Sequence, residues 1–398
     1  MAFPSADKMK AVFFIHHGGP NVLQWGDVPT PPPGPTDAIV KVKACALNHL
    51  DIWVRMGIPG ISVTLPHILG ADVAGVIETV GSNVNNWQPG QKVLVAPGIS
   101  CGACPQCLAG NDHLCDAYDI LGQQSNGGYA EYVKVPAANL LPFPDPLTFE
   151  EAASIPLVFL TAWHMLVTNG NVQKGQTVLI HAGGSGVGIA AIQIAKLKGA
   201  HVITTVGSTE KAKRAKALGA DEVINYREAM GNPAKENKDF PSPLGRPFAE
   251  LTAPGAAGPL MRGQGEGTEQ LHQQTNFQQE VMRITNNRGV DLVVDHIGQE
   301  TFEKSLSSIA KGGKLLTCGA TSGRQIQFDL RALFGRNITI HGSRMGKKTG
   351  LHDALQHVKT GQLKPVIDSV YPLKDAALAH ARMEERKNFG KIILTPAE

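Results

Sequence analysis

The chain has 398 residues, with 37 Lys or Arg against 34 Asp or Glu, so its formal net charge is only +3. This near balance argues against nucleic acid as the main partner, because phosphate binding needs a concentrated basic surface. No run of 18 or more apolar residues occurs, which excludes a membrane-spanning helix, and the first ten residues lack the apolar stretch of a secretory signal, so we expect a cytoplasmic protein.

The N-terminal part is predicted to be rich in strands. Short runs of Val, Ile and Ala at 38–47 and 71–80 are bounded by Pro or Gly, as strands usually are. The segment 29–35 reads PTPPPGP and is predicted to be a surface connector.

Four of the six cysteines form the pattern C-x2-C-x2-C-x7-C. They are Cys101, Cys104, Cys107 and Cys115. Four thiolates so spaced can surround one tetrahedral ion, and such a closed set leaves no open coordination position. Because a cytoplasmic protein does not rely on disulfides, we predict a structural zinc site, and unrelated free cysteines are the alternative.

From about residue 150 the pattern changes to alternating helices and strands. Thr148 and Glu151 form a capping-box pattern before a predicted helix at 150–168. The strands that follow are predicted at 177–182, 201–206, 222–225, 290–296, 314–318 and 338–341, and the helices at 187–198, 209–218, 276–286 and 301–309. This alternation predicts an α/β fold with a parallel sheet covered on both faces.

Two segments depart from the alternation. Residues 229–274 are rich in Pro, Gly and Gln, which predicts a flexible surface insertion; a lid or partner-binding segment is the alternative. Residues 364–394 have strand, helix and strand character, and we expect them to fold back onto the N-terminal part.

A phosphate cradle is predicted in the turn HAGGSGVG at 181–188, between a strand and a helix. Glycines allow close approach of a pyrophosphate, and the helix N-terminus supplies free N–H groups. The predicted cofactor-binding residues of this turn are Gly183, Gly184, Ser185, Gly186, Val187 and Gly188. Ser185 stands where the fingerprint has its middle glycine.

The end of the second strand indicates which dinucleotide binds. An NAD site places an acidic residue there for the ribose 2′-hydroxyl, but here Gly207 and Ser208 are followed by Lys211, Lys213 and Arg214. Cations suit a 2′-phosphate, so we predict NADP, with NAD less favoured. The alternative reading of these cations is a solvated helix face.

These features resemble the zinc-type medium-chain dehydrogenase/reductases, close to their quinone and enoyl reductases. The resemblance rests on the cysteine pattern, the cradle, and the segments 44–51, 69–81 and 127–132. It implies a GroES-like catalytic domain at 1–156, a Rossmann domain at 157–344 and a C-terminal return at 345–398. It also implies a homodimer or homotetramer. Residues that it would place along the nicotinamide are Thr161, Gly319, Gly342 and Ser343, with Tyr226 near the 2′-phosphate.

The departures from that family concern its catalytic zinc. Cys45 matches the first ligand, but the Gly-His-Glu motif reads Gly70-Ala71-Asp72 and the third ligand position reads Leu157. One thiolate and one carboxylate do not make a three-ligand catalytic site.

We therefore predict an NADPH-dependent reductase of quinones, enones or enoyl thioesters, because an electrophilic acceptor needs only hydrogen-bond donors for its developing enolate. Asn48 and His49 are the expected donors, with Cys45 and Asp72 beside them. Trp53 and Phe159 are read as pocket walls or plain core. Two alternatives stay open: an alcohol or aldehyde dehydrogenase with an unusual metal site, and a weakly catalytic NADP-binding partner protein.

Overall fold

A computed structural model describes residues 8–227 and 277–396 of the chain. The predicted insertion at 229–274 lies outside these residues. Among the helices that are described, none combines the length and the apolar character needed to cross a bilayer.

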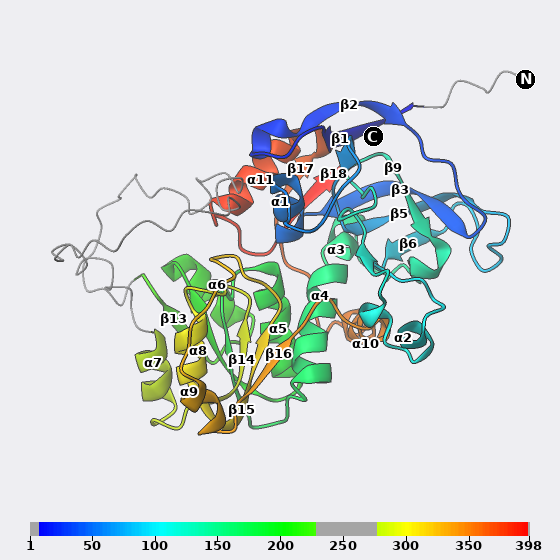
Figure 1. Cartoon of the computed structure of the whole chain (residues 1–398). Coiled ribbons are helices and arrows are strands. Elements are labelled where there is room, and N and C mark those ends of the chain that lie inside the picture. The colour runs from blue at the N-terminus through cyan, green and yellow to red at the C-terminus, as the bar shows by residue number, and fades with distance from the viewer. Residues whose placement is uncertain (1–7, 228–276, 397–398) are drawn as a thin grey trace, which may run out of the picture.

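The β-rich part contains two sheets and a hairpin, drawn at the upper right of Figure 1. The smaller sheet has the order β2 (Gln24–Pro29), β1 (Lys8–Phe14), β4 (His67–Ile68). The larger has the order β10 (Leu140–Pro142), β6 (Lys92–Val95), β5 (Asp72–Val80), β3 (Asp37–Ala46), β18 (Lys391–Thr395), β17 (Ile367–Pro372), and β9 (Tyr132–Pro136) also pairs with β3. The hairpin is β7 (Gly98–Ile99) with β8 (Asp119–Ile120).

The C-terminal segment completes this larger sheet. Strand β18 pairs antiparallel with β3, so that Leu394 lies opposite Cys45. Helix α11 (Ala376–Glu384) lies between β17 and β18 in sequence. Strand β18 of this C-terminal segment therefore lies in the same sheet as the N-terminal strand β3.

The second part is a six-stranded sheet in which every pairing is parallel. Its spatial order is β13 (Glu222–Asn225), β12 (His201–Val206), β11 (Thr177–Ile180), β14 (Val290–Asp295), β15 (Ile309–Thr317), β16 (Thr339–Gly342). The helices that follow its strands or precede them are α5 (Gly186–Leu197), α6 (Thr209–Ala217), α7 (Phe277–Ile284), α8 (Phe302–Ser307) and α9 (Leu330–Phe334).

Side chains alternate between two cores across this sheet. On β11, Val178 and Ile180 join a core built with α5, whereas Leu179 faces a core that contains Phe277 and Val281 of α7. Successive residues of a strand point to opposite faces, so both faces of the sheet are covered. The predicted α/β fold with a doubly covered parallel sheet is therefore confirmed (Figure 1).

The prediction of a single helix at 150–168 is wrong in detail. The structure has three pieces there: α3 (Phe149–Ala153), α4 (Pro156–Trp163) and the π-helix η4 (His164–Asn169). Pro156 lacks an N–H and restricts the residue before it, so α3 ends and α4 begins at this proline. The predicted capping box is present, because Thr148 Oγ1 accepts a hydrogen bond from Glu151 N at 3.2 Å.

Four of the helices were not predicted from the sequence. They are α1 (His49–Met56), α2 (Pro105–Leu108), α9 and α10 (Lys348–Lys359). Helix α1 begins three residues after the end of β3.

The direction in which the strand order grows reverses between β11 and β14. These strands are neighbours in the sheet, although β12 and β13 lie between them in sequence. The chain builds outward from β11 in one direction and then from β14 in the other. In open α/β sheets, ligands bind beyond the carboxyl ends of the strands at such a switch point.

Candidate functional site

The glycine-rich turn between β11 and α5 has the close contacts of a phosphate cradle. A Cβ atom on Gly188 would lie 2.3 Å from Ala182 O, and one on Gly183 would lie 2.4 Å from Thr204 Oγ1. Ser185 is the N-cap of α5, and its Oγ accepts a hydrogen bond from Gly188 N at 3.0 Å. The first N–H groups of α5 can therefore receive an anion.

Most of the other predicted cofactor residues lie at the same edge of the sheet. They follow the strand ends: Ser208 after β12, Tyr226 after β13, Gly319 after β15, and Gly342 and Ser343 at the end of β16. The Oγ of Ser343 is buried and has no partner in the described parts of the chain. Buried polar groups are normally hydrogen-bonded, so this hydroxyl is available to a ligand.

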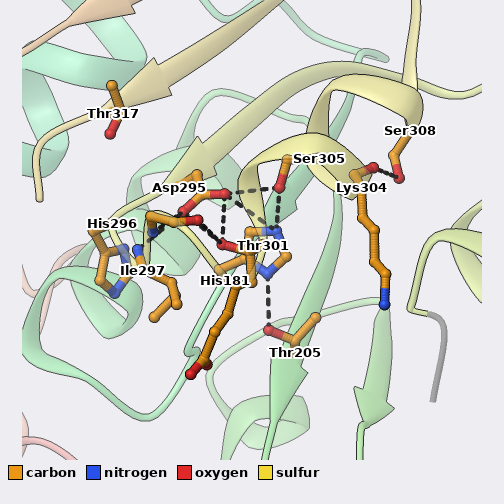
Figure 2. A network of polar contacts seen from close by, with 12 residues as sticks. His181, Thr205, Asp295, His296, Ile297, Thr301, Lys304, Ser305, Ser308 and Thr317 are labelled. Carbon is orange, nitrogen blue, oxygen red and sulfur yellow. Dashed lines mark hydrogen bonds and ion pairs between the residues drawn. The ribbon is translucent and has the colours of Figure 1, made fainter. Parts of the chain in front are cut away.

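Figure 2 shows a polar network that fixes the turn after β14. The Asp295 carboxylate is fully buried and accepts hydrogen bonds from Ile297 N (2.9 Å), Gly298 N (3.1 Å) and Ser305 Oγ (2.8 Å). Thr301 Oγ1 also donates to it, at 2.8 Å. Burial opposes ionisation of Asp295, but His181 and these donors outweigh it, so that its pKa is lowered.

His181 links this network to the second strand. Its Nε2 lies 2.9 Å from Ser305 Oγ, and its Nδ1 lies 3.2 Å from Thr205 Oγ1. Burial lowers the pKa of His181. The first residue of the cradle sequence thus has a structural role, because it joins the carboxyl ends of β11, β12 and β14.

The cations predicted for a 2′-phosphate contact the C-terminal segment. Lys211 Nζ donates to Arg386 O at 2.6 Å, and Arg214 Nη2 donates to Phe389 O at 3.3 Å. The Arg214 guanidinium also lies 4.1 Å from the centre of the Phe389 ring. Burial, followed by nearby cations, lowers the pKa of Lys211.

The same C-terminal segment lies directly over the cradle. Gly390 N donates to Gly184 O at 2.9 Å. A Cβ on Gly186 would lie 3.0 Å from the Cδ of Lys391. We name residues 386–391 the cradle strap, because they pass across the glycine-rich turn at 181–188.

Lys391 ends in a buried polar cluster with Asn48 and Asp72. Its Nζ lies 2.6 Å from Asn48 Oδ1 and 3.0 Å from Asp72 Oδ2. Asn48 Nδ2 donates to Asp72 Oδ2 at 3.0 Å and to Ala46 O at 3.3 Å. Asp72 Oδ1 accepts from Leu157 N at 2.8 Å. Both amide hydrogens of Asn48 are thus engaged within the protein, and the residue holds Lys391 and Asp72 in place.

Cys45 belongs to the core of the β-rich part. It is 1% exposed, and a Cβ on Gly70 would lie 2.7 Å from its Sγ and 2.5 Å from the ring of Tyr129. Burial, with the charges of Asp51 and Asp72, raises the pKa of the Cys45 thiol well above its usual range.

His49 begins α1 and is exposed, unlike its neighbour Asn48. Desolvation by the surrounding protein atoms lowers the pKa of His49 to about 4, and the positive charges of Arg386 and Lys391 act in the same direction. The two charges lower this pKa even though the side chain is exposed to solvent. Its ring centre lies 6.2 Å from that of Trp53. A neutral imidazole therefore stands where the two parts of the molecule meet.

The remaining predicted residues lie deeper. Thr161 and Phe159 are buried on α4, at 4% and 2% exposure. Trp53 is partly exposed, and a Cβ on Gly319 would lie 3.7 Å from its Cη2. Trp53 thus borders the strand-end edge, whereas Phe159 is plain core.

The four clustered cysteines have the arrangement of a metal site. The sulfurs of Cys101, Cys104, Cys107 and Cys115 all lie within 4.8 Å of one another. Within residues 8–227 and 277–396 this is the only group of three or more His, Cys, Asp or Glu side chains that is close enough to hold an ion. Four sulfurs at this separation suit tetrahedral zinc.

Two site residues were missed by sequence reasoning. His296 follows β14 at the switch point, and its Nε2 lies 3.1 Å from Ser185 Oγ; its place as the last residue of the strand predicted at 290–296 was a signal that could have found it. Lys391 had no such signal, because only the fold brings it to Asp72.

Comparison with known proteins gives consistent matches. The model of the alcohol dehydrogenase GroES-like domain matches residues 34–145, and two models of zinc-binding dehydrogenases match 186–245 and 270–394. The chain is 32% identical to the crotonyl-CoA reductase of Streptomyces avermitilis, covering 94% of this chain and 82% of that protein. It is 28% identical to the quinone oxidoreductase of Pongo abelii, covering 97% of each.

A solved structure is also similar. It is described as an NAD-dependent alcohol dehydrogenase, is 44% identical, and has a TM-score of 0.83 over 97% of this chain and 99% of that one.

The buried ion pair of Lys391 and Asp72 leads to a stability prediction. Lys391→Met leaves a buried carboxylate without its cation, so we expect it to lower the free energy of unfolding by about 3 kcal/mol. In the double variant Asp72→Asn/Lys391→Met the charge is gone and the Asn48 amide can rotate to pair with the new amide, so at least half of the loss should return. Urea denaturation measures both variants, and a double variant no more stable than Lys391→Met would contradict the pairing.

Proposed function

Because the chain belongs to the zinc-type medium-chain dehydrogenase/reductase superfamily of NAD(P)-dependent oxidoreductases, we propose that it uses NADPH to reduce an activated C=C bond or a quinone without a catalytic zinc. The observation that carries this proposal is the cluster around Asp72. Where the zinc-dependent relatives would need three ligands, Asp72 binds the ammonium of Lys391 and two N–H donors.

The donor set around this cluster does not suit a metal. The Cys45 thiol packs against Gly70 and Tyr129, and Leu157 contributes a backbone N–H but no ligand atom. Oxidation of an alcohol at neutral pH needs a Lewis acid that favours the alkoxide. Reduction of a quinone, an enone or an enoyl thioester does not, because the acceptor is already electrophilic.

When bound, NADPH supplies the hydride. Hydride addition leaves negative charge on the acceptor oxygen, and a proton must then reach the acceptor. His49 is neutral near pH 7, so its N–H can donate to that oxygen and can pass a solvent proton to the product. Asn48 and Asp72 act as positioning residues, because they fix the charge of Lys391 at the end of the strap.

Two features at the carboxyl end of β12 support NADPH as the cofactor in preference to NADH. The residue at its tip is Ser208, which caps α6 by accepting a hydrogen bond from Lys211 N at 3.2 Å, so no carboxylate is present there for a ribose 2′-hydroxyl. Lys211 and Arg214 lie on the next turns of α6, and the Tyr226 hydroxyl lies close to Gly207. This arrangement suits a 2′-phosphate.

We assign a structural zinc ion to Cys101, Cys104, Cys107 and Cys115. Four thiolates would hold it in a closed tetrahedron. The ion would tie together the short helix α2 and the turn that follows it, and it would take no part in hydride transfer.

The 44% identical structure makes an NAD-dependent alcohol dehydrogenase the second candidate. That activity would require a second metal near Asp72. Metal content and acceptor preference separate the two candidates.

We also propose a homo-oligomer joined at β16, which is an edge strand of the parallel sheet. Leu330 and Phe334 of the neighbouring helix α9 are 64% and 69% exposed. Exposed apolar side chains beside an open strand edge favour contact with a second copy.

The reductase proposal is tested by metal analysis together with an acceptor screen. We expect one zinc per chain, NADPH oxidation with quinones or enones, and no oxidation of alcohols. Two zinc ions per chain with alcohol oxidation would support the second candidate instead.

The cofactor proposal is tested by titrating the protein with NADPH and with NADH. NADPH should bind at least about ten-fold tighter, and Lys211→Ala should remove about ten-fold of that affinity while leaving NADH unchanged, because it loses one charged hydrogen bond. Lys216→Ala, on the same helix but exposed, is the control. Tighter binding of NADH would refute the proposal.

The oligomer proposal is tested by sedimentation velocity. Phe334→Asp should shift the protein to a smaller species, because it places a charge in the contact. Leu378→Asp on α11, where the leucine is 63% exposed, should not. A wild-type protein that sediments as a monomer would contradict the proposal.

A further inference from the structure

His296 has a buried nitrogen without a partner. Its Nδ1 is buried and makes no hydrogen bond to any described residue, although the residue as a whole keeps some exposed surface. Its other nitrogen, Nε2, lies 3.1 Å from the hydroxyl of Ser185. A buried polar atom without a hydrogen-bond partner destabilises the folded protein. We therefore expect a bound ligand to supply the partner of Nδ1.

The backbone that follows His296 is held in place by hydrogen bonds, and the ring of His296 is neutral. The backbone turn that follows it is fixed by the Asp295 carboxylate, which accepts hydrogen bonds from Ile297 N and Gly298 N (Figure 2). Burial lowers the pKa of His296 to about 4. A neutral imidazole has one donor and one acceptor nitrogen, so whichever tautomer forms, Nδ1 retains one unmet hydrogen-bonding capacity.

The place of His296 in the sheet indicates which part of a dinucleotide is near. A dinucleotide lies across the switch point, with one half over each set of strands. The cradle follows β11, whereas His296 follows β14, the first strand of the other half. On that side, a Cβ on Gly319 would lie 3.6 Å from the Cβ of His296 and 3.7 Å from Trp53 Cη2.

We propose that His296 Nδ1 forms a hydrogen bond with a hydroxyl of the ribose that carries the nicotinamide. A hydroxyl both donates and accepts, so it satisfies Nδ1 in either tautomer. Through Nε2 and Ser185, the same ring joins this half of the cofactor site to the phosphate cradle. The inference rests on the proposed use of a nicotinamide cofactor. It assigns His296 to the nicotinamide half of that cofactor and not to the adenosine half.

Two substitutions separate the two nitrogens of the ring. The amide of asparagine reaches about as far from Cα as Nδ1, and that of glutamine about as far as Nε2. His296→Asn should therefore keep the contact with the cofactor, and His296→Gln should keep only the contact with Ser185. We expect His296→Gln to raise the Kd of NADPH about 3- to 10-fold, as for one neutral hydrogen bond, and His296→Asn to change it less than about two-fold.

The adenosine fragment 2′,5′-ADP supplies the second readout, because it lacks the nicotinamide-side ribose. Its Kd should not change in either variant. The control is His201→Phe, which alters an exposed histidine at the opposite end of β12 and should change neither Kd. If His296→Gln does not fold, His296→Phe keeps an aromatic ring but has neither nitrogen, so it should raise the Kd of NADPH at least as much.

Three outcomes would overturn the proposal: an unchanged Kd of NADPH in His296→Gln, a larger loss in His296→Asn than in His296→Gln, or equal losses for NADPH and 2′,5′-ADP. Either of the last two outcomes would indicate that His296 acts only by holding the phosphate cradle in place through Ser185. Because binding requires no electron acceptor, an error in the proposed substrate leaves this test intact. If the chain binds NADH instead of NADPH, the same comparison is made with NADH and 5′-AMP.

Discussion

One buried ammonium group connects the parts of this molecule. Lys391 starts β18, lies along the cradle with its stem, and ends between Asn48 and Asp72. Through Asp72, which also accepts from Leu157 N, the same charge reaches the beginning of α4. A buried charge that loses its partner is strongly destabilising, so these contacts require β18, β5, α1 and α4 to be in place together.

The same cluster explains how a fold related to zinc-dependent dehydrogenases can serve another reaction. A fixed cation is retained near the reaction site, but it belongs to a side chain and is neutralised by Asp72. It therefore does not act as a Lewis acid on an alcohol. In the proposed reduction, the neutral His49 on one side and the strand-end residues on the other would face an acceptor that is already electrophilic.

Local patterns were enough to predict the parallel sheet, the cradle and the cysteine cluster. Each depends on residues close in sequence, such as the capping box of Thr148 and Glu151 or the turn at 181–188. The break at Pro156 was also readable, since proline rarely continues a helix. The contact between Lys391 and Asp72 could not be predicted, because the two residues are 319 positions apart in the sequence. Likewise the sequence places His296 at the end of a predicted strand, but its unpartnered nitrogen depends on packing.

The cradle strap has a consequence for the order in which the protein is made. Synthesis runs from the N-terminus, and folding of domains generally follows that order. The glycine-rich turn and helix α5 are synthesised long before the strap. However, the hydrogen bond to Gly184 comes from Gly390, and the strand that pairs with β3 is β18, so both contacts wait for residues near 390. A nascent chain can thus form the parallel sheet once β16 has been made, but the turn at 181–188 and β3 acquire these contacts only after the residues near 390 have been made.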